Sequence, residues 1–368
     1  MTIFNATARA HAVLPNGIFG DAPPRRILAV KLGSFGDLVQ TTASLRALRR
    51  AFPAADIRVA VERRWAPLLA ACPDVNGVLE ASSRRRLTPG HVWEVRRLLA
   101  EACRGPGPFD LALDFQGTQR SAAWVYLSGA RVKAGRGTPR PGWRAAIATD
   151  RTRHAVRGYA DVCECIGIAA GDLDPALHTS PDDEARIEAI LDGARLPRSG
   201  FVLLNPFSAW RSKSWDERRA AELASQVASV TCGPVVVTGG NDESARAAEV
   251  VRLARHGSVS SLAGRLSLGE ALCLFRRARL MISCDSGPMH AAAALGTPVV
   301  ALFGPTLPEH TGPWGPGHRV VQASRPHDHH AYRRDYGRQH MGALGVQAVA
   351  DAVQGALRAT AVLAATPR

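Results

Sequence analysis

The chain alternates short apolar runs with longer stretches in which apolar residues recur at helical spacing. The short runs, rich in Val, Ile and Leu, predict buried strands, and the longer stretches predict helices. In the first half, strand and helix pairs are expected at 27–30 and 38–50, 57–61 and 65–71, and 111–115 and 117–127. Strands that alternate with helices in this way predict a parallel sheet with right-handed crossovers.

The second half shows the same alternation. Strands are expected at 201–204, 235–238 and 280–282, and helices at 215–230, 242–254 and 268–278. A last stretch, 344–363, also has helical spacing and could pack onto either half. The predicted fold class is α/β, with two doubly wound units of similar size that face each other across a cleft.

Stretches without clear periodicity mark the divisions of the chain. Residues 171–184 are rich in Asp and Pro and are expected to connect the halves. Residues 134–157, and the chain after Pro316, are expected to be irregular. The predicted units are a loose extension at 1–24, a first domain at 25–178, a second domain at 179–343 and a terminal helix at 344–368.

Composition excludes several classes of protein. The 368 residues, 46% of them hydrophobic, are enough for two soluble cores, and no apolar run reaches the length of a membrane span. Residues 1–24 lack the basic start and apolar core of a secretion signal, so a cytoplasmic protein is expected. Seven scattered cysteines show no paired metal spacing and indicate reduced thiols.

The net charge of +14 points to a nucleic acid, an anionic membrane surface or negatively charged small substrates as partners. Nucleic acid is disfavoured because the cations are spread along the chain and are not interleaved with aromatic residues. Almost all of the cations are arginine. The exceptions are Lys31, Lys133 and Lys213. Either these lysines occur by chance, or their compact charge is needed in a tight phosphate site.

The segment from Asp285 to His290 has the pattern of a binding site at a strand end. Asp285 follows an apolar run and is expected at the carboxyl edge of a parallel sheet, where ligands bind. Ser286 suits a helix N-cap and Pro288 a first helical turn, so free backbone N–H groups would favour an anion such as phosphate. An ordinary capped turn remains the alternative.

Two further strand ends in the same half carry polar or glycine-rich loops. The loop 205–215 gathers hydroxyl groups and cations, among them Ser208 and Lys213. The turn that begins at Gly239 and Gly240 follows the next strand. Three such loops on one sheet edge are what a nucleotide site requires.

In the first half, the stretch from Lys31 to Asp37 is a glycine-rich turn between a strand and a helix. Its spacing is neither that of a dinucleotide fingerprint nor that of a P-loop. The turn would let a ligand approach the backbone closely. Asp37 at the helix start either caps the helix or serves as a general base.

Histidines 327, 329, 330 and 340 and the pair Asp172 and Asp174 were weighed as metal ligands. Neighbouring arginines favour a solvated loop for the histidines, and Pro175 favours a surface turn for the aspartates. No metal site is predicted.

Several motifs, taken in order from about residue 26 to 314, resemble those of the ADP-heptose:lipopolysaccharide heptosyltransferases of glycosyltransferase family 9. They are Lys31-Leu-Gly-Ser-Phe-Gly-Asp37, Phe109-Asp-Leu-Ala-Leu-Asp-Phe-Gln116-Gly117, Ser212-Lys213-Ser-Trp215, Gly239-Gly240, Asp285-Ser-Gly-Pro-Met-His290 and Phe303-Gly-Pro-Thr306. The resemblance implies a GT-B fold of two Rossmann-like domains. It also implies an inverting transfer from a nucleotide sugar, with no obligatory cofactor and no metal.

The resemblance also assigns roles to residues. It makes Asp37 the base that deprotonates the acceptor hydroxyl, and places Lys213 on the donor diphosphate. The implied donor site comprises Ser208, Lys213, Gly239, Gly240, Asn241, Asp242, Asp285, Ser286, Gly287 and His290. The implied acceptor side comprises Lys31, Gly36, Gln116 and Gly117. Pro288 and Met289 depart from the family pattern, and the His/Arg-rich segment 327–340 does not align with it.

The partners implied are ADP-heptose as donor and a phosphorylated glycolipid acceptor at the cytoplasmic face of the inner membrane, with no nucleic acid. An arginine-rich acceptor half suits phosphorylated sugars at an anionic membrane surface. The alternatives are the same fold acting on another sugar or acceptor, and a non-catalytic protein that binds a nucleotide sugar.

Overall fold

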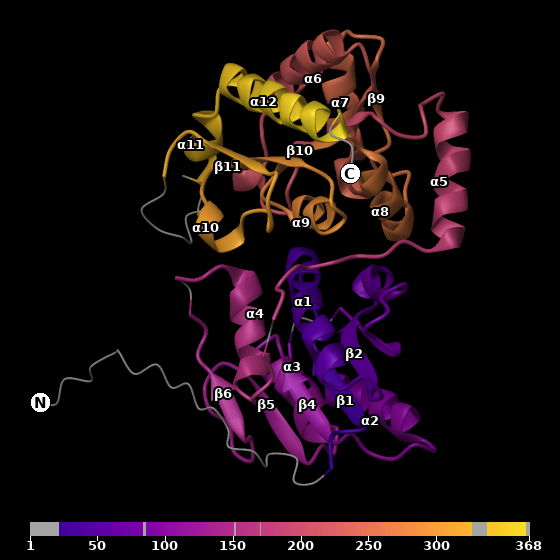
Figure 1. Cartoon of the computed structure of the whole chain (residues 1–368), viewed down its shortest axis with the longest axis vertical. Helices are drawn as coiled ribbons and strands as arrows, with labels where there is room; N and C mark the ends of the chain where they lie inside the picture. Colours follow the sequence, from indigo (N-terminus) through magenta and orange to yellow (C-terminus); the bar gives the residue numbers. More distant parts are fainter. Residues whose placement is uncertain (1–21, 84–85, 151, 170, 326–336, 366–368) are drawn as a thin grey trace, which may run out of the picture.

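The computed structural model describes residues 22–83, 86–150, 152–169, 171–325 and 337–365. It contains two six-stranded sheets, one in each half of the chain, stacked along the long axis of the molecule (Figure 1). Residues 1–21, the larger part of the predicted extension, lie outside the described residues, as do His327, His329 and His330.

The first sheet has the order β3-β2-β1-β4-β5-β6, and all of its strand pairs are parallel. Its strands are β1 (Arg26–Val30), β2 (Asp56–Glu62), β3 (Gly77–Ala81), β4 (Leu111–Asp114), β5 (Val132–Arg136) and β6 (Ala145–Ile147). Its helices are α1 (Phe35–Ala51), the 3₁₀ helix η1 (Arg63–Leu69), α2 (Pro89–Cys103), α3 (Gln119–Leu127) and α4 (Ala155–Glu164). The strand order reverses between β1 and β4, which is where such sheets bind ligands.

The second sheet repeats this topology in the order β12-β11-β10-β7-β8-β9, and it reverses between β7 and β10. Its strands are β7 (Val202–Asn205), β8 (Val235–Val237), β9 (Val259–Ser261), β10 (Leu280–Cys284), β11 (Val299–Phe303) and β12 (Arg319–Gln322). Around it lie α5 (Pro181–Gly193), η2 (Arg211–Lys213), α6 (Glu217–Thr231), η3 (Asn241–Glu243), α7 (Ser244–Ala254), α8 (Leu268–Arg277), α9 (Gly287–Ala294), α10 (Pro308–Thr311), α11 (Gly337–Gly342) and α12 (Val346–Ala365). The two sheets confirm the predicted pair of doubly wound units.

The strands at both switch points are completely buried and largely apolar. Every residue of β1, β4, β7 and β10 is buried. Helices cover both faces of a parallel sheet, so its central strands read as continuous apolar runs. This burial explains why the apolar pattern predicted these strands from the sequence.

Two predictions of irregular structure were wrong, and one predicted helix is of the 3₁₀ type. Residues 134–157 contain part of β5, all of β6 and the start of α4, and the chain after Pro316 contains β12. The strands β6 and β12 are short sheet edges whose residues are exposed or half-buried, so they carry little apolar pattern. The helix expected at 65–71 is the 3₁₀ helix η1, which contains Pro67.

The sequence pattern also missed some elements and left one placement open. It did not anticipate β3, α2 or β9. The terminal helix α12 packs against α6 and the edge of the second sheet (Figure 1). The indole Nε1 of Trp215 donates to the carbonyl of Leu344, 3.1 Å away, and ties the start of α12 to this half.

The two halves meet where α1 and α9 begin (Figure 1). Both helices start at a switch point, so the carboxyl edges of the two sheets face each other at this contact. Across the part of the chain that the structure describes, no helix combines the length and the apolar character needed to cross a bilayer.

Candidate active site

Asp37 lies in the first turn of α1 and is surrounded by donors. Its Oδ2 accepts from the backbone N–H of Ser34 at 3.2 Å and from the Ser34 hydroxyl at 3.1 Å. Its Oδ1 accepts from the hydroxyl of Tyr159 at 2.9 Å, and the Lys31 ammonium lies 3.5 Å from Oδ2. The side chain still keeps 40% of its surface exposed. Asp37 therefore caps the helix and presents a carboxylate to solvent.

These neighbours keep the Asp37 carboxyl ionised. Burial by itself would raise its pKa, but the charge of Lys31 and the hydrogen bonds from Tyr159 and Ser34 outweigh this and lower the pKa to about 2. Burial and the nearby Asp37 raise the pKa of Tyr159 well above its usual value, so the phenol stays protonated and donates. Asp37 is thus a carboxylate, able to accept a proton, at any physiological pH.

Tyr159 has no counterpart in the sequence prediction. It comes from α4 and reaches Asp37 across 122 positions of sequence. The Lys31 ammonium and the Arg136 guanidinium lie 4.9 Å and 4.6 Å from the centre of its ring. A lone tyrosine on a helix carries no local signal of such a role, because only the packing of α4 on α1 brings it to the carboxylate.

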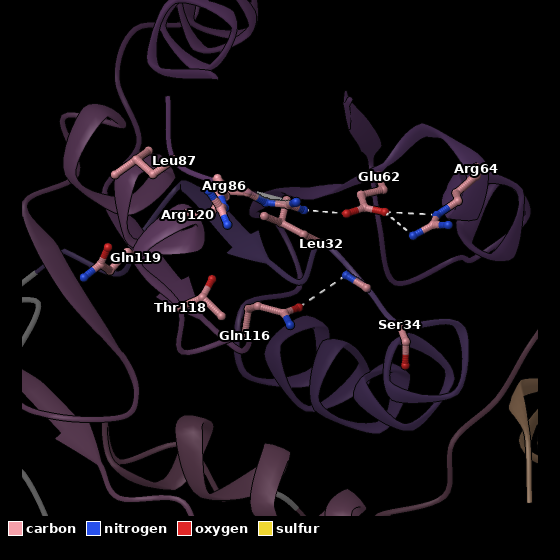
Figure 2. Close-up of a pocket in the computed structure, with 11 residues that line it drawn as sticks. Leu32, Ser34, Glu62, Arg64, Arg86, Leu87, Gln116, Thr118, Gln119 and Arg120 are labelled. Carbon is pink, nitrogen blue, oxygen red and sulfur yellow. Dashed lines mark hydrogen bonds and ion pairs between the residues drawn. The ribbon is translucent and has the colours of Figure 1, made fainter. Parts of the chain in front are cut away.

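A pocket of about 790 Å³ opens beside Asp37 at the carboxyl edge of the first sheet (Figure 2). Ser34 lines it and also donates to Asp37. The other lining residues follow β1, β2 and β4 or precede α2: Leu32, Gly33, Glu62, Arg64, Arg86, Leu87, Gln116, Thr118, Gln119 and Arg120.

Three arginines and a single carboxylate give this pocket its charge. Glu62 bridges Arg64 at 2.8 Å and Arg120 at 2.5 Å. Arg86 adds a further cation, so two positive charges remain in excess in the lining. Guanidinium groups in such a recess suit a ligand that carries phosphate or carboxylate groups.

Of the predicted acceptor-side residues, Gln116 lines this pocket and Lys31 lies behind it. Lys31 is only 2% exposed, and its ammonium donates to Gln116 Oε1 at 3.2 Å. The backbone N–H of Gly33 donates to the same oxygen at 3.3 Å. Lys31 therefore positions Gln116 and Asp37 and does not itself reach the pocket.

Gly117 shapes the turn after β4. Its φ is +75°, and a Cβ there would lie 3.2 Å from the carbonyl oxygen of Arg136, so this turn requires glycine. The buried carboxylate of Asp114 accepts from the backbone N–H groups of Gln116 and Gly117, both at 2.9 Å. The turn thereby holds Gln116 at the pocket wall.

On the facing half, Asp285 and Lys213 form a buried ion pair. Lys213 Nζ lies 2.8 Å from Asp285 Oδ2, and the Thr306 hydroxyl donates to the same oxygen at 2.7 Å. Burial alone would raise the pKa of Asp285, but Lys213, His290 and these hydrogen bonds lower it. The Ser208 hydroxyl donates to the backbone carbonyl of Asp285 at 3.4 Å, so the loop after β7 is fastened to the turn after β10. Thr306 was not among the predicted site residues.

Helix α9 begins without a side-chain cap. Ser286 is its N-cap and a proline stands in its first turn, as predicted. No side-chain hydrogen bond caps the helix, and the Ser286 hydroxyl donates to the carbonyl of Cys284 at 3.1 Å. The backbone N–H groups of the first turn are therefore not taken up by a capping side chain.

Glu243 organises the predicted glycine turn after β8. The backbone N–H of Gly240 donates to Glu243 Oε2 at 2.6 Å. A Cβ on Gly239 would lie 3.1 Å from both Glu243 and Phe207, so the turn packs closely. Asn241 and Asp242 are exposed at the start of η3 on the same edge of the sheet.

His290 lies between the two halves. It is 8% exposed, and its Nδ1 accepts from Gln40 Nε2 of α1 at 3.2 Å. Burial lowers the pKa of His290 to about 4 even though Asp285 and Asp37 oppose the shift, so the ring is neutral at physiological pH. The imidazole thus joins the helix of Asp37 to the turn of Asp285.

Gly36 and Gly287 allow α1 and α9 to approach closely. A Cβ built on Gly36 would lie 2.6 Å from the His290 ring, and one on Gly287 would lie 2.4 Å from the Phe35 ring. The sequence assigned Gly36 to the acceptor side and Gly287 to the donor side. The structure places both at the contact between the halves.

We expect Gly36→Ala to destabilise the protein by about 1–3 kcal/mol. Alanine inside a helix would ordinarily gain up to about 1 kcal/mol. Here the added methyl group meets a buried ring that is held by Gln40, so overpacking outweighs propensity. Thermal unfolding measures the change. Gly193→Ala is the control, because a Cβ at the end of α5 meets nothing within 4 Å; equal melting temperatures for both variants would contradict the prediction.

Two Rossmann-type sheets meet at their carboxyl edges, with a carboxylate and a basic pocket on one side and a lysine–aspartate pair at a helix start on the other. This arrangement is the GT-B architecture of glycosyltransferases, as predicted from the sequence.

The family model of glycosyltransferase family 9 (heptosyltransferase) matches residues 96–338. The chain belongs to this family and is a glycosyltransferase. It is 29% identical over 300 residues to lipopolysaccharide heptosyltransferase 1 of Pseudomonas aeruginosa, covering 79% of this chain and 81% of the relative.

Solved structures show the same fold. A family 9 glycosyltransferase from Veillonella parvula superposes with a TM-score of 0.83 at 21% identity, covering 91% of this chain and 98% of that one. The E. coli heptosyltransferase WaaC, solved with ADP, gives a TM-score of 0.70 at 22% identity, covering 90% and 99% of the two chains.

Proposed function

We propose that this protein transfers heptose from ADP-heptose to a phosphorylated inner-core acceptor of lipopolysaccharide, with inversion at the anomeric carbon. The observation that carries the proposal is the placement of Asp37. This ionised, partly exposed carboxylate adjoins a basic pocket on one half, and the other half carries the Lys213–Asp285 pair just before the start of α9. The Pseudomonas aeruginosa relative, a lipopolysaccharide heptosyltransferase, supports the choice of sugar and acceptor.

The arginine-rich pocket is the proposed acceptor site. Its guanidinium groups would bind phosphates on the acceptor, since their planar fork matches a phosphate in two hydrogen bonds. Ser34 belongs both to the pocket and to the Asp37 cluster. A sugar seated in the pocket could therefore direct a hydroxyl at the carboxylate.

The turn after β10 and the loop after β7 form the proposed donor site. The N–H groups at the start of α9 and the Lys213 ammonium would hold the diphosphate of the donor. We propose that these groups supply the positive charge for the leaving group, so that no metal ion is required. The solved complex of E. coli WaaC with ADP supports a nucleoside diphosphate as ligand of this fold.

The proposed reaction is a single displacement. The acceptor hydroxyl gives its proton to Asp37, and its oxygen forms a bond to the anomeric carbon of the heptose. The bond from that carbon to the diphosphate oxygen breaks, and ADP leaves with the electron pair. Attack from the face opposite ADP inverts the configuration. Movement of the halves about the contact of α1 with α9 would bring the two sites together.

ADP release tests the proposed function. The full-length protein is incubated with ADP-heptose and a heptose-deficient lipopolysaccharide acceptor, and then with other sugar nucleotides. We expect release only when ADP-heptose and the acceptor are both present, with heptose attached to the acceptor by mass spectrometry. If the protein released nucleotide from other sugar nucleotides but not from ADP-heptose, the proposed donor would be wrong. If it released ADP without the acceptor, lipopolysaccharide would no longer be the proposed acceptor.

A further inference from the structure

Helix α2 exposes an aromatic and basic face. Its buried face consists of His91, Val95 and Leu99, which recur every fourth residue and pack toward the first sheet. The opposite face carries Trp93, whose surface is 67% exposed, with Arg96 and Arg97. The turn before the helix adds two exposed residues. We call these residues together the α2 patch: Arg86, Leu87, Trp93, Arg96 and Arg97.

The large ring of Trp93 is left mostly uncovered by the rest of the protein. The ring contact recorded for it is the guanidinium of Arg97, 5.9 Å from the ring centre. The nearby Glu94 is turned away, because both of its carboxylate oxygens accept from Ser82, at 2.6 and 2.8 Å. Glu101 lies 3.9 Å from Arg97, so the patch and this carboxylate together carry a net charge of about +2.

The chemistry of the patch fits an anionic lipid surface. Tryptophan is favoured at the level of lipid headgroups, where its ring is apolar and its N–H can remain hydrated. Arginines beside it are attracted by the negative surface potential of a leaflet rich in anionic lipids. Tryptophan and arginine are also common at protein interfaces, so composition alone does not choose between a bilayer and a protein partner. The position of the patch beside the proposed acceptor pocket favours the bilayer.

The patch is continuous with the acceptor pocket. Arg86 and Leu87 belong to the patch and also line the pocket (Figure 2). In Figure 1, α2 lies at the end of the first half that is remote from the second half. A surface that contacts α2 would therefore meet the pocket mouth without covering the donor half.

We propose that the α2 patch docks the protein on an anionic bilayer, so that the acceptor pocket opens at the membrane surface. Trp93 and Leu87 enter the headgroup region, and Arg86, Arg96 and Arg97 contact lipid phosphates. The role of docking in catalysis rests on the proposed lipid-linked acceptor. The docking itself does not, and it can be measured without any sugar.

Co-sedimentation with vesicles tests the docking. The full-length protein is mixed with vesicles of phosphatidylglycerol and phosphatidylethanolamine, or of phosphatidylcholine alone. We expect binding to the anionic vesicles, weaker binding at high salt, and little binding to the neutral ones. Trp93→Gln and the double variant Arg96→Gln/Arg97→Gln should each lose affinity by roughly tenfold or more.

A matched double variant controls for loss of charge and apolar surface elsewhere. Arg218→Gln/Val230→Gln changes an exposed arginine and a valine, 61% exposed, on α6 of the second half. It should sediment like the wild type, and melting temperatures verify that every variant is folded. The proposal is overturned if wild-type protein ignores anionic vesicles, or if the patch variants bind them as well as the control does. The docking proposal is also overturned if the wild-type protein is a dimer in solution and the patch variants are monomers.

A soluble acceptor separates docking from the proposed function. With a delipidated, phosphorylated core oligosaccharide, the Trp93 and Arg96/Arg97 variants should turn over like the wild type. With the same core carried on lipid in anionic vesicles, they should be slower by roughly tenfold. Failure of the wild type on both acceptors would refute the proposed acceptor, whereas the vesicle result alone decides the docking.

Discussion

Replacing Asp37 by asparagine is expected to lower kcat by roughly 10²–10⁴-fold while the protein remains folded. Asparagine keeps the shape of the side chain, and its carbonyl oxygen can still accept from Tyr159 or from Ser34. It cannot take the proton of the acceptor hydroxyl. Lipid docking and ADP binding should be unchanged, because Asp37 belongs to neither surface.

The control for this variant is Asp172→Asn, which neutralises an exposed aspartate far along the chain, outside the cluster. Initial rates of ADP release at saturating donor measure both variants. Full activity of Asp37→Asn would remove Asp37 as the base. A loss that is cured by raising the acceptor concentration would make it a binding residue instead.

The low pKa of Asp37 determines how the stability of the fold should change with pH. Its pKa in the folded protein is about 2, against 3.8 for a free aspartate, so its interactions stabilise the fold above the higher value. This stabilisation is lost as the pH falls from about 4 through 2. The difference in stability between wild type and Asp37→Asn should accordingly be flat from pH 5 to 8 and shrink below pH 4. Ionisation of Asp37 should not limit activity anywhere in the neutral range.

Replacing Lys213 by methionine is expected to weaken ADP binding by roughly tenfold to a hundredfold and to destabilise the protein by about 3–5 kcal/mol. The loss of affinity follows from removing the cation proposed to hold the diphosphate. The loss of stability follows because the Asp285 side chain is only 5% exposed and would keep its charge without its 2.8 Å partner.

A second substitution separates these two effects. In Lys213→Met/Asp285→Asn the buried charge is gone, so stability should largely return. Affinity for ADP, measured by calorimetry, should remain low. Lys133→Met provides a lysine control on the first half. If ADP affinity returned together with stability, Lys213 would have only a structural role.

The sequence alone could locate those residues of the candidate site whose proposed role depends on a position just after a strand. Ser208, Lys213 and Asp285 lie in the segments that follow the central strands β7 and β10, and Asp37 lies in the first turn of the helix that follows β1. The apolar pattern locates such strands. Residues that act from a distant element were not predictable. Tyr159 and Thr306 reach Asp37 and Asp285 only through folding. Tyr159 stands in no distinctive local pattern, and Thr306 ends one of the family motifs but was not assigned to the site.

His290 is a residue whose local motif was recognised but whose contacts were not predictable from the sequence. Its motif is local, and the resemblance assigned it to the donor site. In the folded chain its ring is buried against Gln40, which is 250 positions away, and it lies between the halves. The need for glycine at 36 and 287 arises in the same way, because at each position a side chain of the opposite half leaves no room for a Cβ.

The sequence by itself determined two doubly wound α/β units and the edge of each sheet that carries the polar loops. Central parallel strands are buried on both faces, so they are apolar along most of their length, and this pattern can be read without coordinates. Only the tertiary structure decided the short edge strands β6 and β12, the meeting of α1 with α9, and the exposure of one face of α2 beside the pocket. These features depend on which surfaces neighbouring elements cover, and contacts between residues far apart in the sequence leave no periodic trace in it.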